Sequence, residues 1–193
     1  MAGREPVPVH VGTRLSTKIL VVHPYDPTTQ FLREIYRDLD CRLVSDFTVY
    51  NGKEKKELKN LMKKYDTIIM LGHGSDKGLY DRLQARYIID DSFANILRNK
   101  NIIGIWCHAN IYFLNNNLKG FYSGMFISEV DEAGIYGADT GENAEDLKTS
   151  NELFAKVMGN ALRNGFSPKE FVYENYVDEN NEVVDMNRNF MFG

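Results

Sequence analysis

The chain has little cysteine: only Cys41 and Cys107 occur in 193 residues. Two thiols make a disulfide scaffold implausible, and a reducing cytoplasm is the expected location. The sequence also lacks any apolar run near the roughly 18 residues of a membrane-spanning helix, so no membrane partner is expected. Its first residues contain no apolar core that could act as a secretory signal.

A basic surplus is absent as well. Lysine and arginine number 23 against 27 acidic residues, for a net charge of −4, which argues against a nucleic-acid partner. The one basic segment, 53–64, is interrupted by glutamates and leucines and indicates a solvated helix face. A hydrophobic content of 43% is typical of a folded domain. We expect one domain at 17–193 after a flexible N-terminal arm at 1–16, which is rich in proline, glycine and charge.

Short apolar runs alternate with helical patterns along the chain. This alternation predicts an α/β fold with a mostly parallel sheet and helices on both faces. A capping box at Thr149 and Glu152 predicts the start of the clearest helix. The predicted strands are 18–23, 41–50, 67–71, 102–106, 125–128 and 188–192, with a small hairpin at 78–80 and 86–90. The main predicted helices are 27–38, 53–64 and 150–164, and a loop is expected at 137–146.

Two predicted strands end in residues that can carry chemistry. TIIMLGHGSDKGLY at 67–80 places His73 and Gly74 after one strand, and NIIGIWCHAN at 101–110 places Cys107 and His108 after the next. Consecutive strands of such a sheet are usually neighbours, and their carboxyl ends meet at one crevice. The sequence therefore predicts that an imidazole and a thiol lie close together there.

These residue types suit nucleophilic catalysis. A cysteine attacks carbonyl groups as a thiolate, and a neighbouring histidine can accept its proton and later return one. The backbone N–H groups of Gly74 and Cys107 are candidates for an oxyanion hole. The expected catalytic pair is therefore His73 as general base and Cys107 as nucleophile.

The order strand, His-Gly, small hairpin, helix, strand, Cys resembles the caspase-like cysteine peptidases of clan CD. That group includes caspases, legumains, clostripain-like and gingipain-like enzymes and CHAT-domain proteins. The matched stretch covers about 18–110, roughly half of the chain. The resemblance implies a caspase-like three-layer sandwich with a six-stranded sheet, and it assigns the same roles to His73 and Cys107. The chain departs from many relatives at Trp106 and His108, which flank the cysteine.

The loop HPYDPTTQ after the first strand is a candidate for substrate recognition. Asp26 stands where arginine-specific relatives carry an acidic pocket residue, which implies a contact with a substrate Arg or Lys. His108 is a second substrate-binding candidate. Asp26 is equally suited to cap a helix that starts at Pro27, and this alternative is favoured. Residues 129–132 supply acidic groups that could face the crevice or form the first turn of a helix.

The sequence thus predicts a thiol protease, a hydrolase that cuts a peptide or protein substrate, with Asp26 indicating a basic residue before the bond. No metal or organic cofactor is expected. The main alternative is a non-catalytic caspase-like module that binds a regulatory protein partner. A zinc site built from His23, His73, Cys107 and His108 is a weaker alternative, because its adjacent ligands are unusual. A nucleotide- or flavin-binding domain is disfavoured because no glycine-rich phosphate loop follows the first strand.

Overall fold

The computed structural model describes residues 18–136 and 144–193. The arm expected at 1–16 and most of the loop expected at 137–146 lie outside these residues. No helix in the described ranges is both long and apolar enough to cross a membrane.

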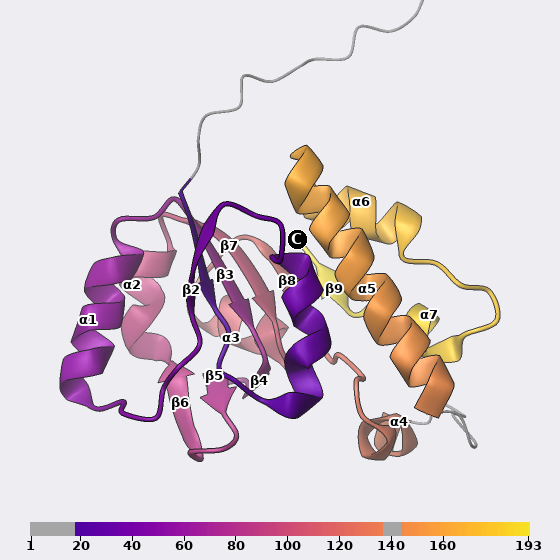
Figure 1. The fold of residues 1–193 in the computed structure, drawn as a ribbon, viewed down its shortest axis with the longest axis horizontal. Helices are drawn as coiled ribbons and strands as arrows, with labels where there is room; N and C mark the ends of the chain where they lie inside the picture. The colour runs from indigo at the N-terminus through magenta and orange to yellow at the C-terminus, as the bar shows by residue number, and fades with distance from the viewer. Residues whose placement is uncertain (1–17, 137–143) are drawn as a thin grey trace, which may run out of the picture.

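A six-stranded sheet forms the centre of the molecule (Figure 1). Its spatial order is β2-β1-β3-β7-β8-β9, in which neighbours are parallel except for the antiparallel last pair. The predicted α/β fold with a mostly parallel sheet is therefore confirmed. The strands are β1 (Ile19–Val22), β2 (Cys41–Val44), β3 (Thr67–Leu71), β7 (Asn101–Ile105), β8 (Phe121–Ser123) and β9 (Met191–Phe192).

Helices cover both faces of this sheet (Figure 1). Side chains alternate along each strand, so that Ile68 and Met70 of β3 join one apolar core while Ile69 and Leu71 join the other. The first core includes α1 (Gly52–Met62), α2 (Ala94–Leu97) and α3 (Ala109–Asn115). The second includes the 3-10 helix η1 (Pro27–Ile35), α5 (Ala144–Asn164), α6 (Pro168–Asn175) and α7 (Glu182–Asn189).

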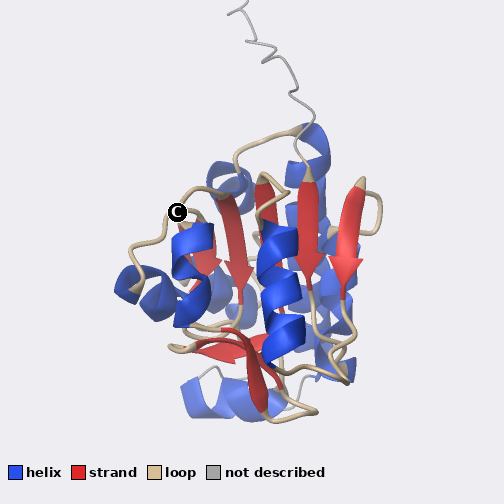
Figure 2. Ribbon diagram, turned by 90° about the vertical axis from the view of Figure 1, so that its left-hand side faces the viewer, coloured by secondary structure: helices blue, strands red, loops and turns tan. Residues whose placement is uncertain are grey.

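A small antiparallel sheet lies beyond the carboxyl ends of the main strands (Figure 2). It consists of β4 (His73–Ser75), β5 (Gly78–Asp81) and β6 (Arg86–Ile89), and it contains the predicted hairpin. The short 3-10 helix η2 (Asp91–Phe93) follows it. Strand β4 was not predicted, because three residues of the type His-Gly-Ser carry no strand pattern. The small sheet therefore starts at the candidate catalytic histidine itself.

The strand predicted at 125–128 is wrong. The strand in this region is β8, which ends at Ser123, and the backbone of Ile127 bonds to a side chain instead of a sheet neighbour. Asn187 accepts from the N–H of Ile127 at 2.7 Å and donates to its carbonyl at 2.9 Å. The apolar run was thus correctly expected to be buried, but its backbone is satisfied by α7.

The start of the long helix also differs from the prediction. Helix α5 begins at Ala144, so Thr149 lies inside it and the predicted capping box does not form. Glu145 and Asp146 instead occupy the first turn, where the helix dipole favours acidic side chains. Helix α4 (Val130–Tyr136) and helix α7 complete the fold. The strand predicted at 188–192 is shorter in the structure, since α7 extends to Asn189 and only β9 follows it.

Candidate functional site

The candidate site lies where the strand order reverses, between β1 and β3. The loops that leave these two strands meet there, since Gly72 after β3 packs beside His23 and Pro24 after β1. In open α/β sheets this position is where ligands usually bind. The crevice at the carboxyl edge, defined by these two loops and the segment after β8, is therefore the natural place for a functional site.

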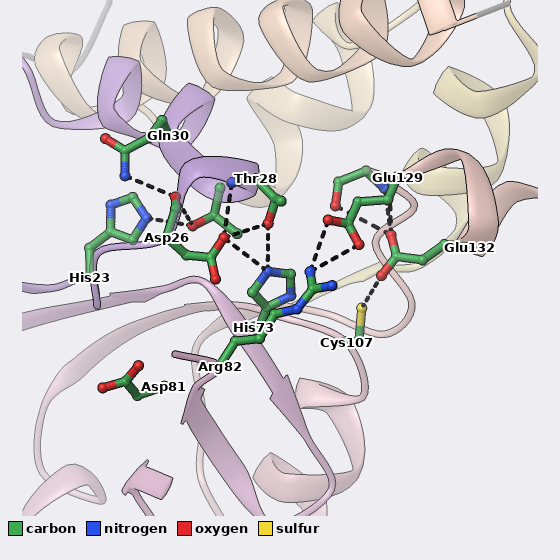
Figure 3. A network of polar contacts seen from close by, with 12 residues as sticks. His23, Asp26, Thr28, Gln30, His73, Asp81, Arg82, Cys107, Glu129 and Glu132 are labelled. Atoms are coloured by element: carbon green, nitrogen blue, oxygen red, sulfur yellow. Dashed lines mark hydrogen bonds and ion pairs between the residues drawn. The ribbon is translucent and has the colours of Figure 1, made fainter. Parts of the chain in front are cut away.

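His73 is held in this crevice by a chain of hydrogen bonds (Figure 3). Thr28 donates to Asp26 through its hydroxyl at 2.8 Å and its backbone N–H at 2.9 Å. The Oγ1 atom of Thr28 lies 2.7 Å from Nε2 of His73. Because the single hydroxyl proton goes to Asp26, Nε2 must donate to Thr28. In the neutral tautomer that makes this bond, the lone pair is on Nδ1.

Asp26 is the N-cap of η1, with Pro27 at the first helical position, as the favoured alternative predicted. Its carboxylate is buried and lies 3.8 Å from Nε2 of His73. Burial acts to raise the pKa of this carboxyl, but the Thr28 hydrogen bonds and the nearby His73 and Arg82 outweigh it and hold the pKa below its usual value. Asp26 is thus an anion that orients His73 through Thr28.

His23 is a core residue and not part of the open site. It is 2% exposed, and its two ring nitrogens face the hydroxyls of Tyr36 and Thr29 at 3.0 and 3.2 Å. Burial, and then the charge of Arg33, lowers its pKa to about 4. Within the described ranges no group of three or more His, Cys, Asp or Glu residues could hold a metal ion. The zinc alternative therefore has no support there.

Cys107 follows β7, and β7 pairs directly with β3. The prediction that these two strands are neighbours is confirmed, and His73 and Cys107 line one recess together with Phe31, Trp106 and Ser128. This recess holds only about 10 Å³, roughly the volume that one water needs. The sheet therefore brings the two residues to one edge, but the space that they share is too small for a substrate.

The thiol of Cys107 has other partners than His73. It points to the carbonyl of Phe126 at 3.6 Å and to Oε1 of Glu132 at 3.8 Å. Burial, and then the negative charge of Glu132, raises its pKa to about 12. At neutral pH the residue is a protonated thiol that donates to a carboxylate, which is the opposite of an activated nucleophile.

A cluster of charged residues closes the other side of the crevice (Figure 3). Arg82, in the loop after β5, makes two hydrogen bonds to Glu129 at 3.0 and 3.2 Å. Glu129 raises the pKa of Arg82 most, and Asp26 and Glu132 add to this effect. Glu132 in turn accepts from the backbone of Ser128 and Glu129 at the start of α4. Arg82 was missed because nothing in its local sequence indicates a contact 47 residues away.

Gly74 and His108 have clear local roles. A side chain on Gly74 would lie 2.1 Å from the Trp106 ring, so this glycine lets β4 pack against Trp106, which follows β7. His108 adopts a left-handed conformation (φ 65°) before α3, and its N–H donates to the carbonyl of Gly124 at 2.6 Å. The proposed oxyanion-hole N–H groups of Gly74 and Cys107, and substrate contacts of His108, stay predictions.

Comparison with known proteins identifies no family for this chain. No family model and no curated protein matches the chain. A solved structure described as an NADH:FMN oxidoreductase in its apo form matches with a TM-score of 0.39 and 11% identity. The match covers 86% of this chain and 94% of that one. At these values the likeness assigns neither a family nor a function.

The prediction of a cysteine endopeptidase is nevertheless corrected. The site itself explains why the prediction is wrong: Cys107 is protonated and bonded to Glu132, while Nε2 of His73 is bonded to Thr28. The hydrolase and thiol-protease class therefore no longer describes this chain.

The raised pKa of Cys107 makes a direct prediction. In a Cys41→Ser variant, iodoacetamide should alkylate the folded protein at pH 7 at least about 100-fold more slowly than the unfolded chain, because almost no thiolate is present. Replacing Glu132 by glutamine removes the neighbouring charge and should accelerate the reaction. Mass spectrometry over time measures both rates. Equal rates in the folded and unfolded protein would show that the thiol is not held in this way.

Proposed function

We propose that the chain is a ligand-binding domain and that its crevice at the carboxyl edge receives a cationic N–H group, a guanidinium or an ammonium. One observation carries this proposal: the guanidinium of Arg82 makes two hydrogen bonds to the carboxylate of Glu129, and the carboxylate of Glu132 lies beside it, bonded to the N–H of Glu129. The crevice thus already holds a group of this chemistry, supplied by the chain itself. A peptide with an Arg or Lys side chain would supply the same group from outside.

The side chain of Arg82 is well placed to give way to such a ligand. It is 52% exposed, and its ion pair joins the small sheet to the segment after β8 across the crevice. An exposed ion pair of this kind is worth less than about 1 kcal/mol. A ligand can therefore exchange with Arg82 at Glu129, and the free Nδ1 of His73 can accept a second hydrogen bond from it.

The resemblance to the caspase-like fold supports the location of this site. In the structure, β3 is followed by the small sheet, whose first strand contains His73 and Gly74, and then by α2, β7 and Cys107, in the order that the sequence suggested. We propose that the finer architecture is the caspase-like three-layer sandwich, adapted here to binding.

A flavin phosphate does not fit the corresponding position. In doubly wound folds the phosphate lies at the N-terminus of the helix after the first strand. That position at η1 is occupied by the buried carboxylate of Asp26, which accepts the N–H of Thr28 and would repel a phosphate. FMN binding, named for the matched oxidoreductase, is therefore not proposed for this chain.

Titration with methylguanidinium tests the proposal. We expect it to shift the NMR signals of the His73 ring, whereas acetate, which has no cationic donor, should not. An Arg82→Ala variant should bind methylguanidinium about tenfold more tightly, because the tethered competitor is removed. Glu129→Gln should weaken binding, because it removes the negative charge.

Lys77→Ala is the matched control, since Lys77 is an exposed cation in the turn between β4 and β5 of the same small sheet. This variant should bind methylguanidinium like the wild type. Unshifted His73 signals, or equal affinities of the wild type and the Arg82→Ala variant, would show that the crevice does not exchange its arginine for a ligand.

A further inference from the structure

A second hollow lies between the turn after β5, the loop after β2 and Tyr25, which follows β1. Its volume is about 300 Å³, at the lower end of small-molecule sites, which suits one long side chain of a peptide. Phe47 is buried in its wall, whereas the apolar side chains of Tyr25 and Leu83 line it from exposed positions. None of its lining residues belongs to the recess that His73 and Cys107 share, so the hollow is a separate place.

A buried carboxylate also lines this hollow. Asp81, the last residue of β5, is 5% exposed, and its Oδ1 accepts the N–H of Gln84 at 3.2 Å. Figure 3 shows this carboxylate turned away from His73 and Arg82. Its Oδ2 has no hydrogen-bond partner among residues 18–136 and 144–193. This oxygen is also not one of the unpaired polar atoms that are sealed from solvent there, so a ligand in the hollow can reach it.

The cation that lies opposite Asp81 in the small sheet does not neutralise it. Arg86 of β6 pairs with Asp81 across the two antiparallel strands, so their side chains share one face. The guanidinium of Arg86 nevertheless donates to the carbonyls of Phe47 and Tyr50, and it forms no ion pair with Asp81. These bonds hold the loop after β2 against the small sheet, so the wall of the hollow is already formed.

A second carboxylate lines the hollow from that loop. Oδ1 of Asp46 accepts the hydroxyl and the backbone N–H of Thr48 at 2.8 and 2.9 Å, and these bonds hold the pKa of Asp46 below its usual value. No lysine or arginine is among the described residues that line the hollow. Two carboxylates beside apolar side chains are complementary to a cation at the end of an aliphatic chain.

We infer that this hollow binds the side chain of an arginine or a lysine in a peptide. The cationic group donates to Oδ2 of Asp81, and the carboxylates of Asp81 and Asp46 balance its charge. The aliphatic part of the side chain packs against Tyr25 and Leu83. This site goes beyond the proposed function, because it uses none of the residues of the crevice.

Three small probes separate the charge from the aliphatic chain. Methylguanidinium has the charge without the chain, valerate has the chain with the opposite charge, and n-butylguanidinium has both charge and chain. We expect n-butylguanidinium to shift the NMR signal of the Gln84 N–H, which is bonded to Asp81. Its affinity should be at least about tenfold higher than that of methylguanidinium, because it buries three more methylene groups. Valerate should leave the signal unchanged.

Two results with these probes would overturn the inference. One is an equal affinity of the two guanidinium compounds at the Gln84 signal. The other is a Gln84 signal that n-butylguanidinium does not move at concentrations up to about 10 mM.

An Asp81→Asn variant tests the buried carboxylate itself. Asparagine keeps an oxygen that can accept the N–H of Gln84, so the turn is preserved while the charge is lost. This variant should bind n-butylguanidinium at least about tenfold more weakly. Asp76→Asn is the matched control, because it removes an exposed carboxylate from the turn between β4 and β5 and should bind like the wild type. Equal weakening in the two variants would contradict a specific site at Asp81.

A Leu83→Ser variant tests the contact with the aliphatic chain. Leu83 is exposed, so the change leaves the fold intact, and it should weaken n-butylguanidinium severalfold without affecting methylguanidinium. The hollow and the crevice are followed by different signals, those of Gln84 and His73. Loss of the Gln84 shift in Asp81→Asn with an unchanged His73 shift would establish two separate sites. A Gln84 shift that disappears in Glu129→Gln but persists in Asp81→Asn would leave only the crevice.

Discussion

Replacing Asn187 by leucine should lower the free energy of unfolding by about 3–5 kcal/mol. The substitution leaves two buried backbone groups without a hydrogen-bond partner, and each such group costs about 1–3 kcal/mol. Asn187 is fully buried and bonds to both the N–H and the carbonyl of Ile127. It also lies 3.4 Å from the hydroxyls of Ser150 and Tyr176. Leucine fills a similar volume, so the loss reports the hydrogen bonds and not a cavity.

Urea unfolding followed by circular dichroism measures this effect. Asn189→Leu is the control, because Asn189 is exposed at the end of the same helix and should change the free energy by no more than about 0.5 kcal/mol. Similar decreases in the free energy of unfolding of the two variants would mean that the hydrogen bonds between Asn187 and Ile127 do not anchor this region.

The same contact explains where sequence reasoning failed on the fold. The apolar runs of β3 and β7 were predicted almost to the residue, because a parallel strand buried on both faces is a short continuous apolar run. Met125 to Ile127 forms an equally apolar run. Its backbone partner is a side chain 60 positions away, and no local pattern distinguishes that from a strand.

In the candidate site, too, the positions set by strands could be predicted from the sequence, and the contacts made by loops could not. Strand order and parallel pairing place His73 and Cys107 at one edge, and that much was predictable from two apolar runs. The partners that decide their chemistry come from loops: Thr28 is 45 residues from His73, and Glu132 is 25 residues from Cys107. Loop conformations carry no periodicity, so the sequence could suggest a pair of residues but not their protonation.

His23 provides the second large effect, through pH. Its folded-state pKa is about 4 against an ordinary value of 6.5, because burial disfavours the imidazolium, with Arg33 adding repulsion. Between these two values the unfolded chain binds a proton at this position and the folded protein does not. The contribution of neutral His23 to the free energy of unfolding is thus fully present above pH 6.5 and is lost as the pH falls toward 4. The shift corresponds to about 3 kcal/mol.

We therefore expect the free energy of unfolding to fall about 3 kcal/mol further between pH 7 and pH 4 in the wild type than in a His23→Gln variant. Glutamine keeps an N–H that can reach Thr29 but cannot titrate, so the acidic side chains contribute equally to both proteins. Urea titrations at several pH values measure the difference. If the two curves of stability against pH run parallel, His23 is not held neutral by its buried hydroxyl partners.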